Sequence, residues 1–308
     1  MKIGIASAIA GIPTKKNLTA YGGIERVVSG LSKAFQDRGH ETIVAGYKGT
    51  DAGDINIELN DERELFNNPI DCDILFDFSH NKFGVAKNKY SIPMYSDQIG
   101  TNPIFPSYAV KNAFKYPDGV VAYMGIQLPQ LRNVKKTNKY CFVGRISRIK
   151  GIDLIEYLIQ HTDLKISIAG HIDAFDKDYA LRFIDMARSY GCEVNTDVQY
   201  DTIIDTLAKS KYFIFSPSWH ILFGNGAVES FGLAAVEALS QNTTVLTSNI
   251  SSGVIEIIRN HGYVLDGLNK WINFIRYPRP PIRDLSKYAQ NFTSDAYADR
   301  LSKITHIQ

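Results

Sequence analysis

The chain has 308 residues, a length that suits two domains of about 150 residues each. Its 34 basic and 32 acidic residues leave a net charge of +2, so no overall field directs the protein to nucleic acid or to an anionic membrane. The three cysteines are Cys72, Cys141 and Cys192, and their wide spacing fits neither a disulfide framework nor a zinc site.

The hydropathy of the chain bears on whether it is secreted or spans a membrane. No apolar run reaches the roughly 18 residues of a membrane span, and the first residues enter a strand pattern without the apolar core of a signal peptide. We therefore expect a cytoplasmic protein without a transmembrane segment, a location that still allows peripheral association with a membrane.

The first part of the chain alternates between strand and helix patterns. Lys2 to Ala8 is an apolar run typical of a strand, and residues 24–38 carry apolar side chains at helical spacing until Gly39. A strand at Glu41–Ala45 follows at once, which makes a βαβ unit and implies a parallel sheet. Further strands are expected at Asp73–Phe78, Ile92–Tyr95 and Gly119–Met124.

A polar stretch without periodicity, Gln130 to Asn138, indicates a linker, and the alternation resumes after it. Strands are expected at Tyr140–Val143, Leu164–Ala169, Tyr212–Ser216 and Thr244–Thr247, and helices at Asp153–Gln160, Tyr179–Tyr190, Ile203–Ser210, Phe231–Ser240 and Gly253–Asn260.

These patterns predict an α/β protein with two Rossmann-like, doubly wound parallel-sheet domains that face a central cleft. We place the domains at residues 1–136 and 137–285, and we expect short helices in residues 286–308 that could pack back on the first domain. Ligands of such sheets bind at the carboxyl ends of the strands, so a shared ligand would lie in the cleft.

The first candidate site is a glycine pair, Gly22 and Gly23, between the first strand and the first helix. Glycines allow a backbone to approach a phosphate, and a helix N-terminus offers free N–H groups and a positive dipole end. The same glycines would also suit a simple turn.

The second candidate is Gly144, Arg145 and Lys150, after the first strand of the second half. Two fixed cations at a strand end could bracket a diphosphate and stabilise the charge of a departing nucleotide, without a metal. A solvated basic loop would contain the same residues.

The third candidate is a pair of carboxylates, Glu229 and Glu237. Eight helical steps of about 1.5 Å span on the order of 12 Å, comparable to the distance between the sugar ring and the ribose of a nucleotide sugar. Carboxylates accept paired hydrogen bonds from vicinal hydroxyls, so each could hold one sugar. Between them, the N–H groups of Phe231, Gly232 and Leu233 begin a helix and could face phosphates.

Two readings of these carboxylates remain open. One is a loop Glu followed by a solvated helix Glu; the other is a ligand site. Glu237 is flanked by apolar residues, so we expect it to be partly buried, and a buried carboxylate requires partners.

His80 follows a first-domain strand, where it is either functional or a structural hydrogen-bonding residue.

Together these motifs resemble those of the retaining glycosyltransferases of family 4 (group 1), which have the GT-B fold. The resemblance covers nearly the whole chain, through Gly22–Val27, Gly144–Arg145, Lys150–Gly151, Ala169–Gly170 and Glu229–Glu237. In similar proteins the glycine loop, the Arg and the Lys contact the donor diphosphate, the first Glu binds the donor sugar and the second Glu binds the ribose. The resemblance implies catalytic roles for Arg145, Lys150, Glu229 and His80, and substrate binding by Gly22, Gly23, Gly144, Ser230, Phe231, Gly232, Leu233 and Glu237.

The resemblance implies a retaining, hexosyltransferase-type enzyme. It would use a nucleoside-diphosphate sugar as donor, no cofactor and no metal ion, and a glycan, lipid or protein acceptor that the sequence does not identify. The first domain would be the acceptor side and the second would bind the nucleotide sugar. Two alternatives stay open: a nucleotide-sugar epimerase of the same fold, and a catalytically inactive nucleotide-sugar-binding protein. The oligomeric state is not predicted.

The sequence departs from the family pattern at two places near the carboxylates. Residues 220–228 form an insertion directly before Glu229. The turn after the second Glu usually carries Gly and Pro in similar proteins, whereas it reads Gln241-Asn242-Thr243-Thr244 here. Together with the short first domain, these departures leave the acceptor without a basis for inference.

Overall fold

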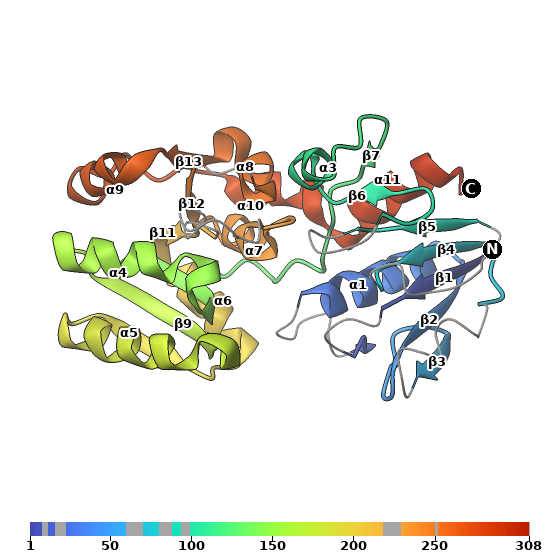
Figure 1. The fold of residues 1–308 in the computed structure, drawn as a ribbon, viewed down its shortest axis with the longest axis horizontal. Coiled ribbons are helices and arrows are strands. Elements are labelled where there is room, and N and C mark those ends of the chain that lie inside the picture. Colours follow the sequence, from blue (N-terminus) through green and yellow to red (C-terminus); the bar gives the residue numbers. More distant parts are fainter. Residues whose placement is uncertain are drawn as a thin grey trace. The chain divides into compact units, whose positions relative to one another are not determined.

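The structure is a computed structural model that describes residues 1–7, 12–15, 23–59, 70–79, 88–93, 99–217, 229–249 and 252–307. The chain forms two compact units (Figure 1). Unit 1 comprises Met1–Leu128 and Asn291–Gln308, and unit 2 comprises Pro129–Gln290.

Unit 1 is built on a five-stranded parallel sheet in the order β3-β2-β1-β4-β5. Its strands are β1 (Lys2–Ala6), β2 (Glu41–Tyr47), β3 (Ile55–Leu59), β4 (Ile74–Asp77) and β5 (Lys89–Ser91). The strand order reverses between β1 and β4, which is the doubly wound arrangement. Helix α1 (Ile24–Asp37) packs on this sheet, and Phe35 stacks on Phe76 of β4 with ring centroids 5.8 Å apart.

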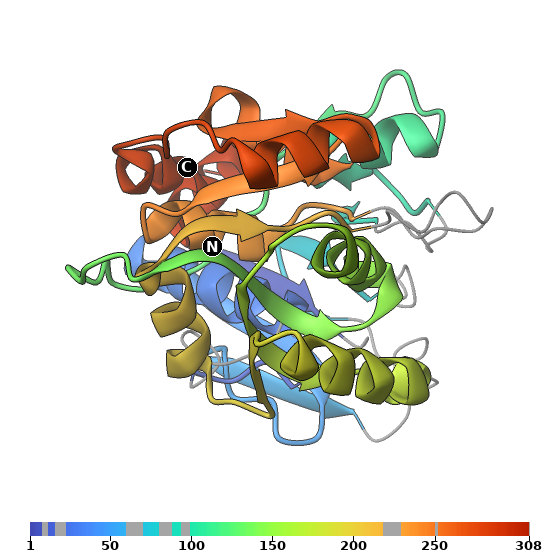
Figure 2. The ribbon, with the colours of Figure 1, turned by 90° about the vertical axis from the view of Figure 1, so that its left-hand side faces the viewer.

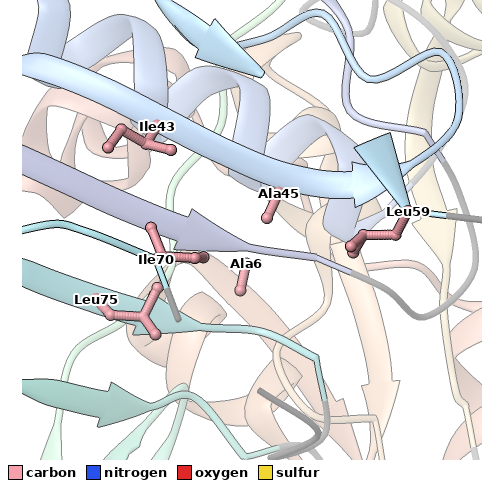
Figure 3. Packing of buried hydrophobic residues seen from close by; sticks show 6 residues of the cluster. All are labelled: Ala6, Ile43, Ala45, Leu59, Ile70 and Leu75. Atoms are coloured by element: carbon pink, nitrogen blue, oxygen red, sulfur yellow. The ribbon is translucent and has the colours of Figure 1, made fainter. Parts of the chain in front are cut away.

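A hydrophobic cluster in unit 1 joins side chains of β1, β2, β3 and β4 with Ile70, which precedes β4 (Figure 3). Alternate residues of a strand point to the same face, so Ile43 and Ala45 of β2 enter the cluster together. The other members are Ala6, Leu59, Ile70 and Leu75.

The remaining elements of unit 1 include β6 (Ile104–Phe105), α3 (Tyr108–Ala113), β7 (Val120–Val121) and the C-terminal helix α11 (Ser294–Thr305). Helix α11 packs along α1. Arg38, at the end of α1, binds Asp295 and Asp299 of α11 at 2.8 and 2.7 Å. These contacts join the two ends of the chain in one unit.

Unit 2 contains a six-stranded parallel sheet in the order β10-β9-β8-β11-β12-β13. Its strands are β8 (Asn138–Ile146), β9 (Ile166–Ile172), β10 (Glu193–Thr196), β11 (Ser210–Ile214), β12 (Thr244–Ser248) and β13 (Gly262–Leu265). Tyr140 to Val143 are all buried, as expected for a central parallel strand covered on both faces.

Helices cover both faces of this sheet. Figure 2 faces the side covered by α4 (Ile152–His161), α5 (Lys177–Ser189) and α9 (Gly267–Arg276). The other helices are α6 (Tyr200–Lys209), α7 (Leu233–Ser240), α8 (Gly253–Ile258) and α10 (Leu285–Ala289), and α7 packs against the other three. Across the described part of the chain, no helix is both long enough and apolar enough to cross a membrane.

Both sheets confirm the predicted doubly wound α/β fold, but several predicted boundaries are wrong. The strand expected at 92–95 lies at Lys89–Ser91 instead, where the buried Lys89 ammonium pairs with Asp77 of β4 at 2.8 Å. Only Val120 and Val121 of the strand expected at 119–124 are extended in a ladder.

The segment before β8 has no regular structure and is tied to the turn after α7. Gln241 donates to the carbonyl of Gln130 at 3.1 Å and accepts from the N–H of Arg132 at 3.1 Å. Lys136 donates to the Gln241 carbonyl at 2.9 Å and to the Thr243 hydroxyl at 2.7 Å, and burial lowers the pKa of Lys136 to about 8. The polar turn after α7 therefore anchors this segment through Gln241 and Thr243.

Two glycines allow close backbone contacts near the carboxyl ends of the central strands of unit 2. A Cβ at Gly170 of β9 would lie 1.7 Å from the carbonyl oxygen of Gly144 of β8. A Cβ at Gly151 would lie 2.2 Å from the carbonyl oxygen of Ser216, just beyond β11. Because neither glycine has a Cβ, β8 can approach β9 closely at Gly144, and the loop after β8 can touch Ser216 just beyond β11.

Two glycine substitutions test this packing. Gly151 and Gly267 have φ angles of +83° and +74°, but only Gly151 has a backbone neighbour in the way of a Cβ. Each change to Ala should cost about 1–2 kcal/mol of backbone strain, and Gly151→Ala should lose about 1–3 kcal/mol more through overpacking. Chemical unfolding of both variants measures the difference; equal losses would contradict the close approach.

Candidate functional site

The first part of the site is the loop that follows β8. Gly144 has a φ angle of +135°, and Arg145 and Ile146 complete the strand. A short 3-10 helix, Arg148–Lys150, follows, and Gly151 then precedes α4 as its N-cap. Since Gly151 abuts Ser216, this loop lies where the strand order of the sheet reverses, between β8 and β11. That is the position at which doubly wound sheets bind ligands.

The side chain of Arg145 lies beside the carboxyl end of the neighbouring strand, β9. Its guanidinium lies 3.3 Å from a carboxylate oxygen of Asp173, the residue after β9, and its side chain remains 47% exposed. Asp173 is buried and also accepts from the N–H of Phe175 at 3.1 Å. Asp173 was not predicted from the sequence; its signal is an acidic residue placed directly after a strand beside β8.

Arg148 is held in a different way. It binds Asp176 at 2.6 Å, and its guanidinium lies 4.9 Å from the ring centre of Tyr179. The hydrogen bonds that Arg148 donates to the Asp176 carboxylate raise the pKa of Arg148. Burial and a hydrogen bond to Glu156 raise the pKa of Tyr179. Arg148 therefore belongs to a pair beside the site, distinct from Arg145 and Lys150.

Lys150 and Glu229 meet directly. The Lys150 ammonium lies 2.5 Å from a carboxylate oxygen of Glu229, and their side chains are 24% and 18% exposed. The Glu229 carbonyl accepts from the N–H of Gly253 at 3.0 Å, which fixes this loop against the start of α8. A Cβ at Gly253 would lie 2.5 Å from the carbonyl oxygen of Ser230, so any other residue here would force the backbone to shift.

Helix α7 begins at Leu233, later than the sequence suggested. Gly232 precedes it with a φ angle of +101°, and the Gly232 carbonyl accepts from Ala235 and Val236. The expected helix start at Phe231 is wrong, because Gly232 adopts a left-handed conformation that a helix cannot include. Phe231 is instead a buried residue of the loop. The span from Glu229 to Glu237 is thus a loop followed by a helix, and the estimate of about 12 Å from a continuous helix does not apply.

Glu237 lies within α7 and is buried, with 5% of its surface exposed. The hydroxyl of Tyr200, the first residue of α6, donates to one of its carboxylate oxygens at 2.6 Å. The predicted burial is confirmed. Tyr200 was not predicted, because it lies 37 residues away in the sequence and is brought close only by the packing of α6 on α7.

The predicted residues of the first domain are only partly described. Gly23 precedes α1, and its N–H donates to the side chain of Glu25 at 2.8 Å. Gly22, His80 and the insertion at 220–228 lie outside the described residues. Within the ranges that are described, no three His, Cys, Asp or Glu side chains are grouped to hold a metal ion.

The geometry of unit 2 can be compared with known proteins. Residues 126–272 match the family model for glycosyl transferases group 1. No curated protein matches the chain by sequence. The family match covers β8, its basic loop, Glu229 and Glu237.

Solved structures show the same architecture over the whole length. AviGT4, a glycosyltransferase involved in avilamycin A biosynthesis, has a TM-score of 0.75 and 20% identity, with 99% of this chain and 97% of that chain covered. The sucrose-phosphate synthase of Thermosynechococcus elongatus has a TM-score of 0.69 and 14% identity, with 99% and 98% covered. HepE of Anabaena, solved with UDP-glucose, has a TM-score of 0.71 and 14% identity, with 100% of both chains covered. These similarities show the GT-B fold.

The ion pair between Lys150 and Glu229 can be tested by a double-mutant cycle. Lys150→Met and Glu229→Gln should each leave a partly buried charge without its partner, so the two changes should couple by about 0.5–3 kcal/mol in the free energy of unfolding. The exposed pair Lys33 and Asp37, at 2.5 Å and with side chains 51% and 56% exposed, is the control and should couple by about 0.3–0.5 kcal/mol. A coupling no larger than that of the control would show that Lys150 and Glu229 do not pair in solution.

Proposed function

We propose that this protein is a hexosyltransferase-type enzyme that moves a sugar, with retention of configuration, from a nucleoside-diphosphate sugar to an acceptor. The observation that carries the proposal is the meeting of Lys150 and Glu229 beside the start of α7, at the strand-order reversal of unit 2. Both residues lie within the range matched by the glycosyl transferases group 1 family model.

The basic loop and the start of α7 suit a diphosphate. Arg145 and Lys150 supply two fixed cations, and the N–H of Leu233 lies at a helix N-terminus, where the dipole favours an anion. Gly144, Ser230 and Gly232 shape the backbone around this position, as the positive φ angles of the two glycines indicate. Guanidinium and ammonium groups are both strong partners for phosphate oxygens.

The two carboxylates suit the two ends of the same ligand. Glu229 precedes the N-terminus of α7, and Glu237 lies beyond it inside the helix. A nucleotide sugar has the same order: a sugar, a diphosphate and a ribose. Glu229 would therefore bind hydroxyls of the donor sugar while Glu237 binds those of the ribose, and each carboxylate can accept hydrogen bonds from a vicinal diol.

The proposed reaction needs no group beyond these side chains and the donor. The bond from the anomeric carbon to the phosphate oxygen breaks, and the acceptor oxygen forms a new bond to that carbon on the same face. The acceptor proton passes to an oxygen of the departing diphosphate. Arg145 and Lys150 stabilise the negative charge that develops there, and Glu229 orients the sugar.

The donor and the contribution of unit 1 are open to direct test. HepE was solved with UDP-glucose, so UDP-hexoses are the first donors to try. Gly23, at the start of α1, and the undescribed Gly22 and His80 are proposed contacts from the first domain. An epimerase would convert the donor without any acceptor, and an inactive binding protein would bind it without turnover.

We expect activity to be independent of divalent metal ions, because Arg145 and Lys150 would supply the positive charge at the diphosphate. Transfer, or slow hydrolysis of the donor in place of transfer, should continue at an unchanged rate in excess EDTA. Loss of turnover that is restored by magnesium or manganese would contradict this role of the two cations.

The two carboxylates should have separable effects. Glu229→Gln should lower turnover strongly, since misplacement of the sugar by about 1 Å can cost on the order of 100-fold. Glu237→Gln should instead weaken a nucleoside diphosphate by about 1.5–3 kcal/mol, the range for a hydrogen bond to a charged group, and should leave the 2′,3′-dideoxy form unaffected. Calorimetric titration and turnover of both variants make the comparison. Normal turnover of Glu229→Gln, or equal loss of both nucleotides in Glu237→Gln, would overturn the assigned roles.

A further inference from the structure

The contact between Tyr200 and Glu237 stands out among the buried polar groups of unit 2. Tyr200 opens α6 and Glu237 lies in α7, and both are buried, with 9% and 5% of their surfaces exposed. The hydroxyl of Tyr200 donates to a carboxylate oxygen of Glu237 at 2.6 Å. This distance is typical of a strong hydrogen bond from a hydroxyl to a carboxylate.

The two side chains differ in how freely they move. A glutamate has three side-chain torsions, and its carboxylate can take many positions unless a partner holds it. A tyrosine ring turns about only two torsions, and at Tyr200 the ring is enclosed where α6 packs on α7. The tyrosine hydroxyl is therefore a rigid donor that selects one position of the Glu237 carboxylate.

We propose that Tyr200 is a positioning residue that orients Glu237 for the ribose of the nucleotide. This inference rests on the proposed function, in which Glu237 accepts hydrogen bonds from the ribose hydroxyls. Tyr200 itself touches the carboxylate and not the ligand. Its contribution is to hold the acceptor oxygens in the geometry that a ribose diol requires, so that less freedom is lost when the nucleotide binds.

A single hydroxyl can be removed to test this. Tyr200→Phe keeps the ring and removes the hydroxyl that donates to Glu237. The matched control is Tyr179→Phe, which deletes a hydroxyl donor to another glutamate of unit 2, Glu156, and keeps the ring beside Arg148. Thermal unfolding of both variants sets a titration temperature well below the lower midpoint, so that each is folded during the measurement.

The probes are uridine, guanosine and adenosine diphosphates, and each is compared with its 2′,3′-dideoxy form. Each probe is titrated calorimetrically into four proteins: wild type, Tyr200→Phe, Tyr179→Phe and Glu237→Gln. For the nucleotide that wild type binds, Tyr200→Phe should weaken the ribose form by about 3- to 10-fold, the equivalent of one ordinary hydrogen bond, and leave the dideoxy form unchanged. Tyr179→Phe should change neither. A merely structural role for Tyr200 would weaken both forms alike.

The outcomes separate this inference from the function on which it rests. If Glu237→Gln loses affinity only for the ribose form while Tyr200→Phe binds like wild type, the positioning role is wrong and the proposed function stands. Tighter binding of the ribose form by Tyr200→Phe would show that the tyrosine competes with the nucleotide, and would also overturn the inference. If wild type binds none of the three nucleotides, or Glu237→Gln shows no dependence on the ribose hydroxyls, both the inference and the assigned role of Glu237 fail.

Discussion

Two glycines, Gly170 and Gly151, leave no room for a side chain where the central strands of unit 2 end. Gly170 lies against the carbonyl of Gly144, and Gly151 lies against the carbonyl of Ser216. Strand β8 thereby approaches β9 closely at Gly144, and the loop after β8 lies against Ser216, just beyond β11. Lys150 of this loop pairs with Glu229, which is 79 residues away in the sequence. Any Cβ at these glycines would move the backbone that carries the two cations, so the geometry of the candidate site depends on this packing.

The charged groups of the site each have a partner, and their exposure to solvent decreases from Arg145 to Glu237. Arg145 is about half exposed beside Asp173, Lys150 and Glu229 are mostly covered, and Glu237 is buried with a hydrogen bond from Tyr200. A paired side chain is held in one position, and partial exposure keeps the cost of removing its charge from water small. Such preorganised charges are what stabilisation of a departing diphosphate requires.

The sequence was most informative where patterns are local. The alternation of strands and helices correctly predicted two doubly wound sheets, because apolar runs such as Tyr140–Val143 report burial directly. Strands β10 and β13 were not predicted, since each is short, lies at or near a sheet edge and has at most one fully buried residue. The start of α7 was misplaced because Gly232 has a positive φ angle, which the periodicity of the apolar residues does not report.

The site residues also fall into two groups: those that a local motif suggests, and those whose contacts form only in the folded structure. Arg145, Lys150 and Glu229 could be proposed from motif and spacing, and the structure brings the last two together. Asp173 and Tyr200 were not proposed, because their partners lie 28 and 37 positions away in the sequence. The order of the strands and the packing of α6 on α7 create these two contacts. Their pairing depends on tertiary structure rather than on a sequence motif.

The most direct test of the account is whether nucleotide sugars stabilise the folded chain through these side chains. Thermal unfolding should be followed with uridine-, guanosine- and adenosine-diphosphate hexoses, for wild type and for the double variant Lys150→Met with Glu237→Gln. One donor class at 100 times its dissociation constant should stabilise wild type by about 2.7 kcal/mol and should leave the double variant unchanged. Equal stabilisation of both proteins, or none by any of these donors, would contradict the claim that this edge of unit 2 binds a nucleotide sugar.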